Sequence, residues 1–516
     1  MPLFRLPFIS PEQMKSEIVA LDRHTCSGYD SIPAVFLIEC AEELSLPLSA
    51  IFNMSIAQGE YPSLLKFNNI VPIYKLEGDK SRVESYRPIS IQPVISKLFE
   101  RIVNRALRRH VEQFICAEQH GFTSTKSTVT NLLCYKDYIS SAFDDGLQVH
   151  SIYTDLAKAF DTVSHDLLLL KMRNFFGFGE NELKWFTSYL NERYQRVVLK
   201  GVESDWMLVT SGVPQGSILG PTLFLMYIND LPLCFRSSDC LLFADDVKVF
   251  KRISAINDCL DLQRDLNSLS EWCSKWQMKF NLSKCSFINF SLKRSRNISF
   301  DYFLNNSILK QVSHIRDLGV HFTSSLSFSF HVCTVVSKAF RMFGFIKRTM
   351  SPFKNTFVLK VLYNAYIRSC LDYCSSVWSP NTKCLINKIE RVQKKFVKHL
   401  CFLNETDFCN NRYEELCKQF QLTSLEQRRK VTDLVLFHKV LHGKVKCSNL
   451  LSCISLNIPP RRTRHTKALI VSKNCRLQMR KNDFFPRTVS LVNELDELDF
   501  FDVSLTKTSI SSALTF

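Results

Sequence analysis

The chain has 516 residues, of which 46% are hydrophobic and 22% are charged, a balance that is typical of globular domains and argues against intrinsic disorder. Its length allows two or three compact units, and the lack of any uninterrupted run of eighteen apolar residues argues against a membrane span. The 66 basic and 49 acidic residues give a net charge of +17, which favours a polyanionic partner.

The first predicted elements are helical, and strands follow. Residues 10–13 combine an N-cap serine, a proline at the first helical position and a glutamine at the capping-box position. After a loop over 24–33, residues 36–56 are predicted to be helical and mostly buried. Residues 68–75 form an apolar strand pattern that ends in lysine, and 85–114 a short extended piece followed by a long amphipathic helix.

Strands and helices then alternate, and the C-terminal third is helical. The alternation over residues 148–250 favours an α/β fold over an all-helical bundle. From about residue 331 the pattern is helical and basic, and residues 459–467 have the composition of a linker or an exposed basic loop. We therefore predict a mixed α/β fold with a helical, basic C-terminal region.

The positive charge is confined to that C-terminal region. Residues 1–330 hold 35 basic and 35 acidic residues, which leaves 31 of the 66 basic and 14 of the 49 acidic residues for 331–516. A solvated basic surface would explain the excess. So would a surface that follows phosphate groups, with an affinity that falls as salt rises because counterions are released.

The nineteen cysteines do not indicate a disulfide framework. No apolar signal segment opens the chain, and no C-x-x-C pair is present, so we expect a reduced, intracellular protein without a zinc ribbon. His120 and His165 have no metal-ligand partners at a useful spacing, and we interpret both as structural.

An acidic cluster carries the chemical hypothesis. The segment LLFADDVKVF (241–250) predicts a β-hairpin that displays Asp245 and Asp246 at its tip. Taken alone, an ordinary Asp-rich turn is the more common explanation. The segment HSIYTD (150–155), however, predicts a strand that ends in Asp155 and is followed by helical spacing, and an unpaired carboxylate at the end of a buried strand is costly.

Three such carboxylates would repel one another, and at least one would take up a proton unless a cation joined them. A pair of Mg²⁺ ions resolves this, since Mg²⁺ prefers carboxylate and phosphate oxygens. Two ions about 3.5–4 Å apart would clamp the attacking and leaving oxygens of an in-line displacement. This hypothesis requires folding to gather carboxyl groups about ninety residues apart into one pocket.

Four motifs in order make the sequence recognisable: YRPIS (86–90), DLAKAFD (155–161), GVPQGSILGP (212–221) and FADD (243–246). Each alone is weak, but chance would not reproduce both their order and their spacing. The chain resembles the reverse transcriptases of non-LTR (LINE-type) retrotransposons, most closely the jockey-like group of animals, over roughly residues 10–400.

The resemblance implies an RNA-directed DNA polymerase that extends a DNA primer or target 3′ end with dNTPs on an RNA template. It implies a right-hand architecture whose α+β palm holds Asp155, Asp245 and Asp246 as catalytic ligands of two Mg²⁺ ions, or of Mn²⁺ in their place. The domains we expect are these: 1–68, an N-terminal extension packing on the fingers; 69–322, fingers and palm; 323–400, a helical thumb; and 401–516, a basic C-terminal region.

The resemblance also implies contacts to the incoming nucleotide, from Lys75, Arg87, Phe160, Gln215, Gly216 and Lys284. Lys75 and Arg87 would hold the triphosphate, although without the resemblance both are ordinary solvated bases. Phe160 would exclude a ribose 2′-hydroxyl, and its ordinary interpretation is a core residue. Lys284 would donate a proton to pyrophosphate or contact a phosphate.

Two departures from the family stand out. Thr123 occupies a position that is often basic in the family, with Lys126 further on, which puts a template contact in doubt. About seventy residues precede the fingers, too few for an endonuclease domain of ordinary size, so we expect a polymerase-only product. A degenerate RNA-binding relic and an RNA-directed RNA polymerase are the alternatives. The acidic triad argues against the first, and Phe160 with the A-D-D hairpin argues against the second.

Overall fold

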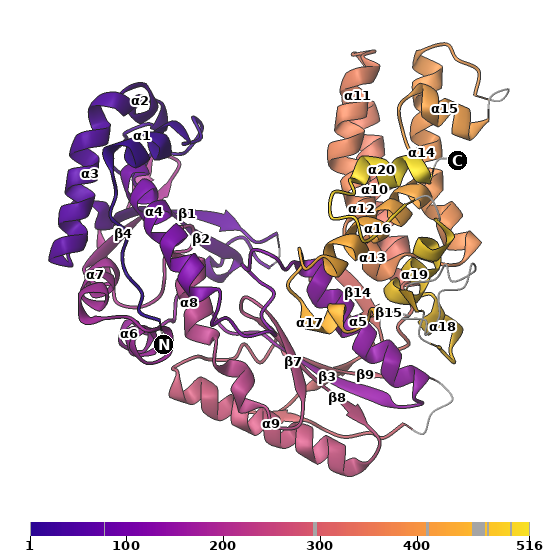
Figure 1. The fold of residues 1–516 in the computed structure, drawn as a ribbon, viewed down its shortest axis with the longest axis horizontal. Helices are drawn as coiled ribbons and strands as arrows, with labels where there is room; N and C mark the ends of the chain where they lie inside the picture. The colour runs from indigo at the N-terminus through magenta and orange to yellow at the C-terminus, as the bar shows by residue number, and fades with distance from the viewer. Residues whose placement is uncertain are drawn as a thin grey trace.

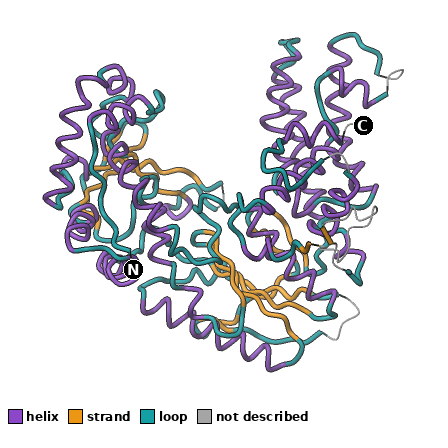
Figure 2. The backbone as a smooth tube through the Cα atoms, in the orientation of Figure 1, coloured by secondary structure: helices purple, strands orange, loops and turns teal. Residues whose placement is uncertain are grey.

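The structure is a computed structural model, and it describes residues 2–76, 78–292, 297–408, 412–456, 470–471, 474–495 and 498–514. The chain has the shape of a broad U (Figure 1), with a central sheet at its base, an N-terminal arm on one side and a C-terminal arm on the other. The two large sheets lie in the N-terminal arm and the base, whereas the C-terminal arm is almost entirely helical (Figure 2). The predicted linker over 459–467 lies outside the described residues.

The N-terminal arm is built around seven helices: α1 (Pro11–Val19), α2 (Ala34–Glu39), α3 (Ala41–Gln58), α4 (Val94–Val111), α6 (His165–Phe176), α7 (Glu180–Leu190) and α8 (Gly220–Ile228). The predicted cap of the first helix is confirmed, because Ser10 Oγ accepts a hydrogen bond from Gln13 N at 3.2 Å. The prediction that 36–56 is mostly buried is wrong. Phe36 and Leu46 are 58% and 65% exposed, since α2 and α3 cover the arm from outside and present only one face to its core.

An outer sheet in this arm contains the strand predicted over residues 68–75 and the extended piece predicted from residue 85, which pair as a hairpin. Its strands are β1 (Phe67–Tyr74), β2 (Tyr86–Ile91), β4 (Arg193–Leu199), β5 (Val202–Glu203) and β6 (Met207–Val209). They run in the order β2-β1-β4-β5, with β6 beside β4. β1 and β2 pair antiparallel, which sets Arg87 opposite Ile73 near the loop that connects the two strands.

The central sheet has the order β12-β9-β3-β8-β7. Its strands are β3 (Gln148–Thr154), β7 (Asp239–Phe243), β8 (Asp246–Ile253), β9 (Ser286–Phe290) and β12 (Lys310–Val312). β3 lies between β8 and β9 and is antiparallel to both. α5 (Thr128–Asp144) covers one face and α9 (Ile256–Lys275) the other (Figure 1), so β3 is buried almost throughout, as an internal strand with two covered faces must be.

Three two-stranded ribbons complete the strands of the described residues: β10 (Phe303–Leu304) with β11 (Ser307–Ile308), β13 (His314–Asp317) with β14 (Val320–Thr323), and β15 (Ser455–Leu456) with β16 (Ile470–Val471). The β13–β14 ribbon contains the turn at Leu318 and Gly319, both at positive φ, and leads directly into the C-terminal arm.

The C-terminal arm confirms the predicted helical pattern. Its helices are α10 (Ser329–Thr349), α11 (Thr356–Leu362), a π-helical stretch (Tyr363–Arg368), α12 (Ser369–Asp372), α13 (Ser375–Trp378), α14 (Lys383–Leu403), α15 (Tyr413–Gln419), α16 (Leu425–Leu441), α17 (Ser448–Leu451), α18 (Gln478–Lys481), α19 (Phe484–Glu494) and α20 (Lys507–Ala513). One apolar core runs from α5 through α10, α14 and α16 to α19. Residues beyond 400 therefore share a core with the central sheet. Helix α14 also continues through residue 400, where we predicted a boundary between two domains.

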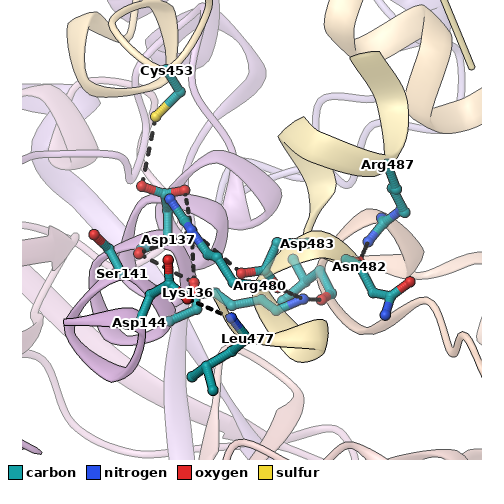
Figure 3. Close-up of polar contacts among 12 residues, drawn as sticks. Lys136, Asp137, Ser141, Asp144, Cys453, Leu477, Arg480, Asn482, Asp483 and Arg487 are labelled. Carbon is teal, nitrogen blue, oxygen red and sulfur yellow. Dashed lines mark hydrogen bonds and ion pairs between the residues drawn. The ribbon is translucent and has the colours of Figure 1, made fainter. Parts of the chain in front are cut away.

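Charged side chains join the end of the arm to α5 (Figure 3). Arg480 Nη1 donates to Asp137 Oδ1 at 2.6 Å and to Asp483 Oδ2 at 3.3 Å, while Lys136 Nζ lies 2.8 Å from Asp483 Oδ1. Arg487 pairs with Asp433 at 2.9 Å. Part of the basic excess of the C-terminal region is thus neutralised inside the protein. Among the described helices, none is both long and apolar enough to cross a membrane.

Candidate active site

The predicted hairpin with two aspartates is present. Phe243 of β7 pairs with Asp246, the first residue of β8, so Ala244 and Asp245 form a two-residue turn. Ala244 has φ 55°, a left-handed conformation that costs an L-residue with a Cβ roughly 1–2 kcal/mol. This strained turn projects Asp245 and Asp246 from the end of the sheet.

Asp155 lies at the same end of the sheet. The β3–β8 register ends at the pair Thr154 and Val247, so Asp155 directly follows this pair on one strand and Asp246 directly precedes it on the other. Asp155 Oδ2 is 3.7 Å from Lys284 Nζ. Asp155, Asp246 and Lys284 all line one cavity of about 280 Å³, so folding brings together carboxylates from distant parts of the chain.

The three carboxyl groups are neighbours, but they do not form a closed ligand set. A group of three His, Cys, Asp or Glu side chains could share a metal ion if their ligand atoms lay within 4.8 Å of one another. Among the described residues one such group exists, and it does not include these aspartates. Three ionised carboxylates repel one another. Joint coordination of one ion by all three would therefore require their side chains to move closer together.

The pKa values show this repulsion. Burial and the neighbouring Asp155 raise the pKa of Asp245, against the opposing charges of Lys284 and Arg87. Asp246 reaches solvent at the mouth of the cavity. Its partial desolvation there, together with Asp245, Asp317 and Asp155, still raises its pKa to about 7. A group of acids whose ionisation is disfavoured in this way is suited to binding a cation.

A fourth carboxylate beside the site was not predicted. Asp317 is buried, and its Oδ2 accepts from Lys248 Nζ at 2.5 Å and from the Tyr153 hydroxyl at 3.1 Å. Because Asp317 is paired, it is a structural partner of the sheet end rather than a free ligand. No local pattern distinguishes it in the sequence, since its partners lie far away along the chain.

Gln119 holds the strained turn and was also missed. Its Oε1 accepts from Ala244 N at 2.9 Å and from Gly121 N at 2.8 Å, and its Nε2 donates to Ala244 O at 3.4 Å. Both backbone groups of Ala244 are therefore satisfied by one buried side chain. A Cβ on Gly121 would lie 2.3 Å from Ala244 N, so this glycine was the one available sequence signal of close approach.

Two predicted basic residues face this region from the β1–β2 hairpin. Arg87 is exposed on β2, and its charge is close enough to lower the pKa of Asp245. Lys75 follows β1 and donates through Nζ to Glu84 O at 2.7 Å. Burial raises the pKa of Asp161, and the charge of Lys75 is one of those that oppose this rise. The hairpin thus directs positive charge toward the acidic end of the central sheet.

The predicted loop at Gln215 and Gly216 lies against β2. Ser90 N donates to Gln215 O at 2.7 Å, and a Cβ on Gly216 would lie 2.6 Å from Ser90 O. The Gln215 side chain donates to Asp161 Oδ1 at 2.9 Å, so Asp161 positions this loop. Phe160 stacks on Phe224 with ring centroids 4.4 Å apart and is only partly buried.

The residues after Asp155 form turns rather than the predicted helix, which begins only at His165. His165 Nε2 bonds to Gly212 O at 2.8 Å, in keeping with a structural role. Lys126 donates through Nζ to Ala117 O and Gln119 O, so its ammonium group is bound to two backbone carbonyl groups of the protein.

The prediction that His120 has no metal-ligand partners is wrong. Its ring lies with the thiols of Cys134 and Cys447, whose ligand atoms are mutually within 4.8 Å. Burial, with the charges of Lys126 and Lys248, lowers the pKa of His120 to about 3, so the imidazole is neutral at pH 7. Sequence spacing could not indicate this group, because Cys447 lies more than three hundred residues away from the other two.

The class of domain follows from comparison with known families. Residues 77–322, which include the β1–β2 hairpin loop, the acidic sheet end and the β13–β14 ribbon, match the family described as reverse transcriptase (RNA-dependent DNA polymerase). This segment is therefore similar to reverse transcriptase domains, and the mixed α/β architecture agrees with that similarity.

Individual relatives show which group of reverse transcriptases the chain resembles. The chain is 28% identical over 403 residues to the probable RNA-directed DNA polymerase from transposon BS of Drosophila melanogaster, an alignment that covers 76% of this chain and 44% of that protein. It is 27% identical over 408 residues to the RNA-directed DNA polymerase from mobile element jockey of the same species, covering 77% and 44%. The resemblance to jockey-like non-LTR retrotransposon reverse transcriptases is confirmed, and the chain spans less than half the length of these relatives.

Proposed function

We propose that this chain is an RNA-directed DNA polymerase that extends a DNA 3′ end with dNTPs on an RNA template. The observation that carries the proposal is the meeting of Asp155 with Asp245 and Asp246 at one end of the central sheet, within the segment that matches reverse transcriptases. The raised pKa values of Asp245 and Asp246 support a site that gains from a bound cation.

Asp155, Asp245 and Asp246 fit a pair of Mg²⁺ ions, because they offer only oxygen ligands and their negative charge is only partly offset by Lys284 and Arg87. When bound, such ions would supply Lewis-acid stabilisation of the attacking 3′-hydroxyl and of the leaving pyrophosphate in an in-line displacement. Mn²⁺ has the same ligand preference and could take their place.

The other side chains bind and orient the substrates in this proposal. Arg87, and Lys75 after release from Glu84 O, would contact the triphosphate from the β1–β2 hairpin, where the planar guanidinium of Arg87 suits paired phosphate contacts. Lys284, an exposed partner of Asp155, would hold a proton near the leaving group or contact a phosphate.

The loop with Gln215 and Gly216 would support the new base pair, with Asp161 fixing the Gln215 amide. Phe160, stacked on Phe224, would exclude a ribose 2′-hydroxyl by its bulk.

The arms fit the two sides of a right-hand polymerase. We assign the outer sheet and its helices to the fingers, with residues 1–68 packed on them, and the central sheet up to residue 322 to the palm. The helices over 323–400 would be the thumb, and the basic residues exposed on 331–516 would follow the phosphates of the template–primer duplex. Such a surface suits A-form duplexes, whose base edges are hidden from side chains.

Primer extension on oligo(dT)-primed poly(rA) with Mg²⁺ tests the proposal. We expect incorporation of dTTP and little incorporation of UTP, and we expect Phe160→Ala to increase the use of UTP, with thermal unfolding to check that the variant is folded. Equal use of UTP by the unmutated chain would indicate an RNA polymerase. Binding of the duplex without incorporation of dTTP would indicate a relic that only binds RNA.

A further inference from the structure

The strongest unexplained feature is a buried group of one imidazole and two thiols between α5 and the C-terminal arm. His120 is 1% exposed, and Cys134 and Cys447 are 9% and 7% exposed. A ring nitrogen of His120 and both sulfurs lie within 4.8 Å of one another, and the two sulfurs are 3.4 Å apart. Three side chains that can ligate a soft metal ion thus converge from separate parts of the fold.

Hydrogen bonds prepare His120 as a ligand. Thr130 Oγ1 donates its single proton to Ser127 O at 2.8 Å and accepts from Ser127 N at 2.9 Å. The 2.8 Å contact between His120 Nδ1 and Thr130 Oγ1 must therefore be donated by Nδ1. The neutral ring has one proton, so Nε2 carries the free lone pair. Fixing the tautomer through the other ring nitrogen is the usual arrangement around metal-bound histidines.

We propose that His120, Cys134 and Cys447 bind a Zn²⁺ ion that fastens the C-terminal arm to the central sheet. Two thiolates and one imidazole, with water in the fourth position, form a tetrahedral zinc ligand set that is known from catalytic sites, and here it would serve a structural ion. Binding converts both thiols to thiolates and releases their two protons to solvent, with no change of oxidation state.

The position of the group gives the ion a structural task. Cys134 is on α5, and Cys447 directly precedes α17, which lies against α5 (Figure 1). His120 N donates to Leu242 O at 2.9 Å, on the strand that ends at the candidate catalytic turn. A metal at this point therefore joins three segments, from the Gln119 loop, the α5 helix and the C-terminal arm, next to the hairpin with Asp245. This proposal does not rest on the proposed polymerase activity.

A disulfide between Cys134 and Cys447 is the competing use of the two thiols. It would leave the prepared lone pair of His120 without a task, and the sulfurs are 3.4 Å apart, beyond a disulfide bond of about 2.05 Å. The metal uses all three side chains and is therefore the better account.

The test is titration of the full-length, reduced and metal-depleted chain with Co²⁺, followed by displacement with Zn²⁺. We expect one Co²⁺ per chain with a thiolate-to-cobalt charge-transfer band, which the carboxylates of the acidic site cannot produce. His120→Ala, Cys134→Ala and Cys447→Ala should each abolish the band, and Cys401→Ala, at another buried cysteine, should retain it. Absence of the band, or its persistence in the three variants, would overturn the proposal.

X-ray absorption of the zinc-loaded unmutated chain gives a second answer that does not depend on folded variants. The proposal requires two sulfur neighbours at about 2.3 Å and a nitrogen neighbour at about 2.0–2.1 Å. A shell of oxygen and nitrogen alone contradicts it. So does a Cys134–Cys447 disulfide found by mass spectrometry in the chain purified without reductant and free of zinc.

Discussion

The acidic end of the central sheet and the junction between α5 and the C-terminal arm are both rich in charge, but the charges are arranged in opposite ways. At the junction, Lys136 and Arg480 each meet a carboxylate within 2.6–2.8 Å (Figure 3), and within the arm Arg487 meets Asp433 at 2.9 Å. At the sheet end, Asp245 and Asp246 lie near one another and near Asp155. Among the described residues, the one ion pair that these three aspartates form is between Asp155 and Lys284, at 3.7 Å and partly exposed to solvent.

This difference indicates that one cluster of charges has a structural role and the other a functional role. Buried charges that are fully paired hold two parts of the fold in one arrangement, and removing one partner leaves the other uncompensated. Like charges gathered without enough counter-charge cost stability, and they are retained where a ligand completes them. The paired cluster fixes the arm, and the unpaired cluster is where chemistry is expected.

The largest expected effect on stability is at the junction. Asp483→Ala would leave Lys136 without its carboxylate and Arg480 with one fewer, and we expect the free energy of unfolding to fall by about 3–5 kcal/mol. Lys284→Ala, which breaks the exposed pair at the sheet end, should change it by about 1 kcal/mol or less. Urea unfolding of both variants measures the contrast, and equal losses would remove the distinction between the two clusters.

Gln119→Ala should have the next largest effect. It leaves the buried backbone groups of Ala244 without partners, which costs about 1–3 kcal/mol. Because the turn carries Asp245, we also expect the extension rate to fall roughly 10-fold or more, as for other side chains that orient ligands. Gln113→Ala, at an exposed position of the same region, is the control. Unchanged extension rates in both variants would show that the Gln119 side chain does not position the turn.

A smaller effect depends on pH. The pKa of Asp246 is raised to about 7 in the folded chain, above its ordinary value of 3.8, so the folded state binds more protons between these values and stability falls as pH rises. Without divalent cations, Asp246→Asn should be more stable than the unmutated chain at pH 8, by up to about 1 kcal/mol after allowance for solvent screening.

That advantage should shrink as pH falls through 7 toward 4. Urea unfolding at pH 5 and pH 8 measures it, with Asp166→Asn, at an exposed residue of α6, as the control. A variant that is less stable than the unmutated chain at pH 8 would mean that Asp246 is a paired, structural carboxylate like those at the junction.

The smallest effect concerns the basic charge that the junction does not neutralise. Lys394 and Lys398 are exposed on α14. Lys394→Gln/Lys398→Gln should weaken duplex binding and reduce the slope of log affinity against log salt by up to about 1 per lost phosphate contact. Lys15→Gln/Lys184→Gln on the N-terminal arm should change this slope less. Deletion of 401–516 is a poorer test, because those residues share a core with α5. Equal slopes in both variants would mean that α14 does not follow the duplex.

Sequence patterns predicted the elements of this molecule better than their partners. The alternation before Asp155 and the turn around Asp245 are local signals, so the strand, the hairpin and their aspartates could be predicted. The helices after residue 331 were visible for the same reason. The exposed faces of α2 and α3 were not, because an apolar segment can cover a core as well as lie inside it.

The contacts that fix the site could not be predicted from the sequence, for a different reason. Gln119 meets Ala244, and Lys248 meets Asp317, across separations of 125 and 69 residues. Periodicity carries no information about such pairs. The His120 cluster shows the same limit, since local spacing alone led to the wrong conclusion that it has no ligand partners.

Single-turnover primer extension by Asp155→Asn/Asp245→Asn is the most direct test of the central claim, that the unpaired carboxylates form the catalytic site. The affinity of the same sample for the RNA–DNA duplex is measured in parallel by fluorescence anisotropy. We predict that the extension rate falls by more than about 100-fold while duplex affinity is retained, because metal ligands are lost and the phosphate-binding surface is not. Extension by the double variant at the rate of the unmutated chain would contradict the account.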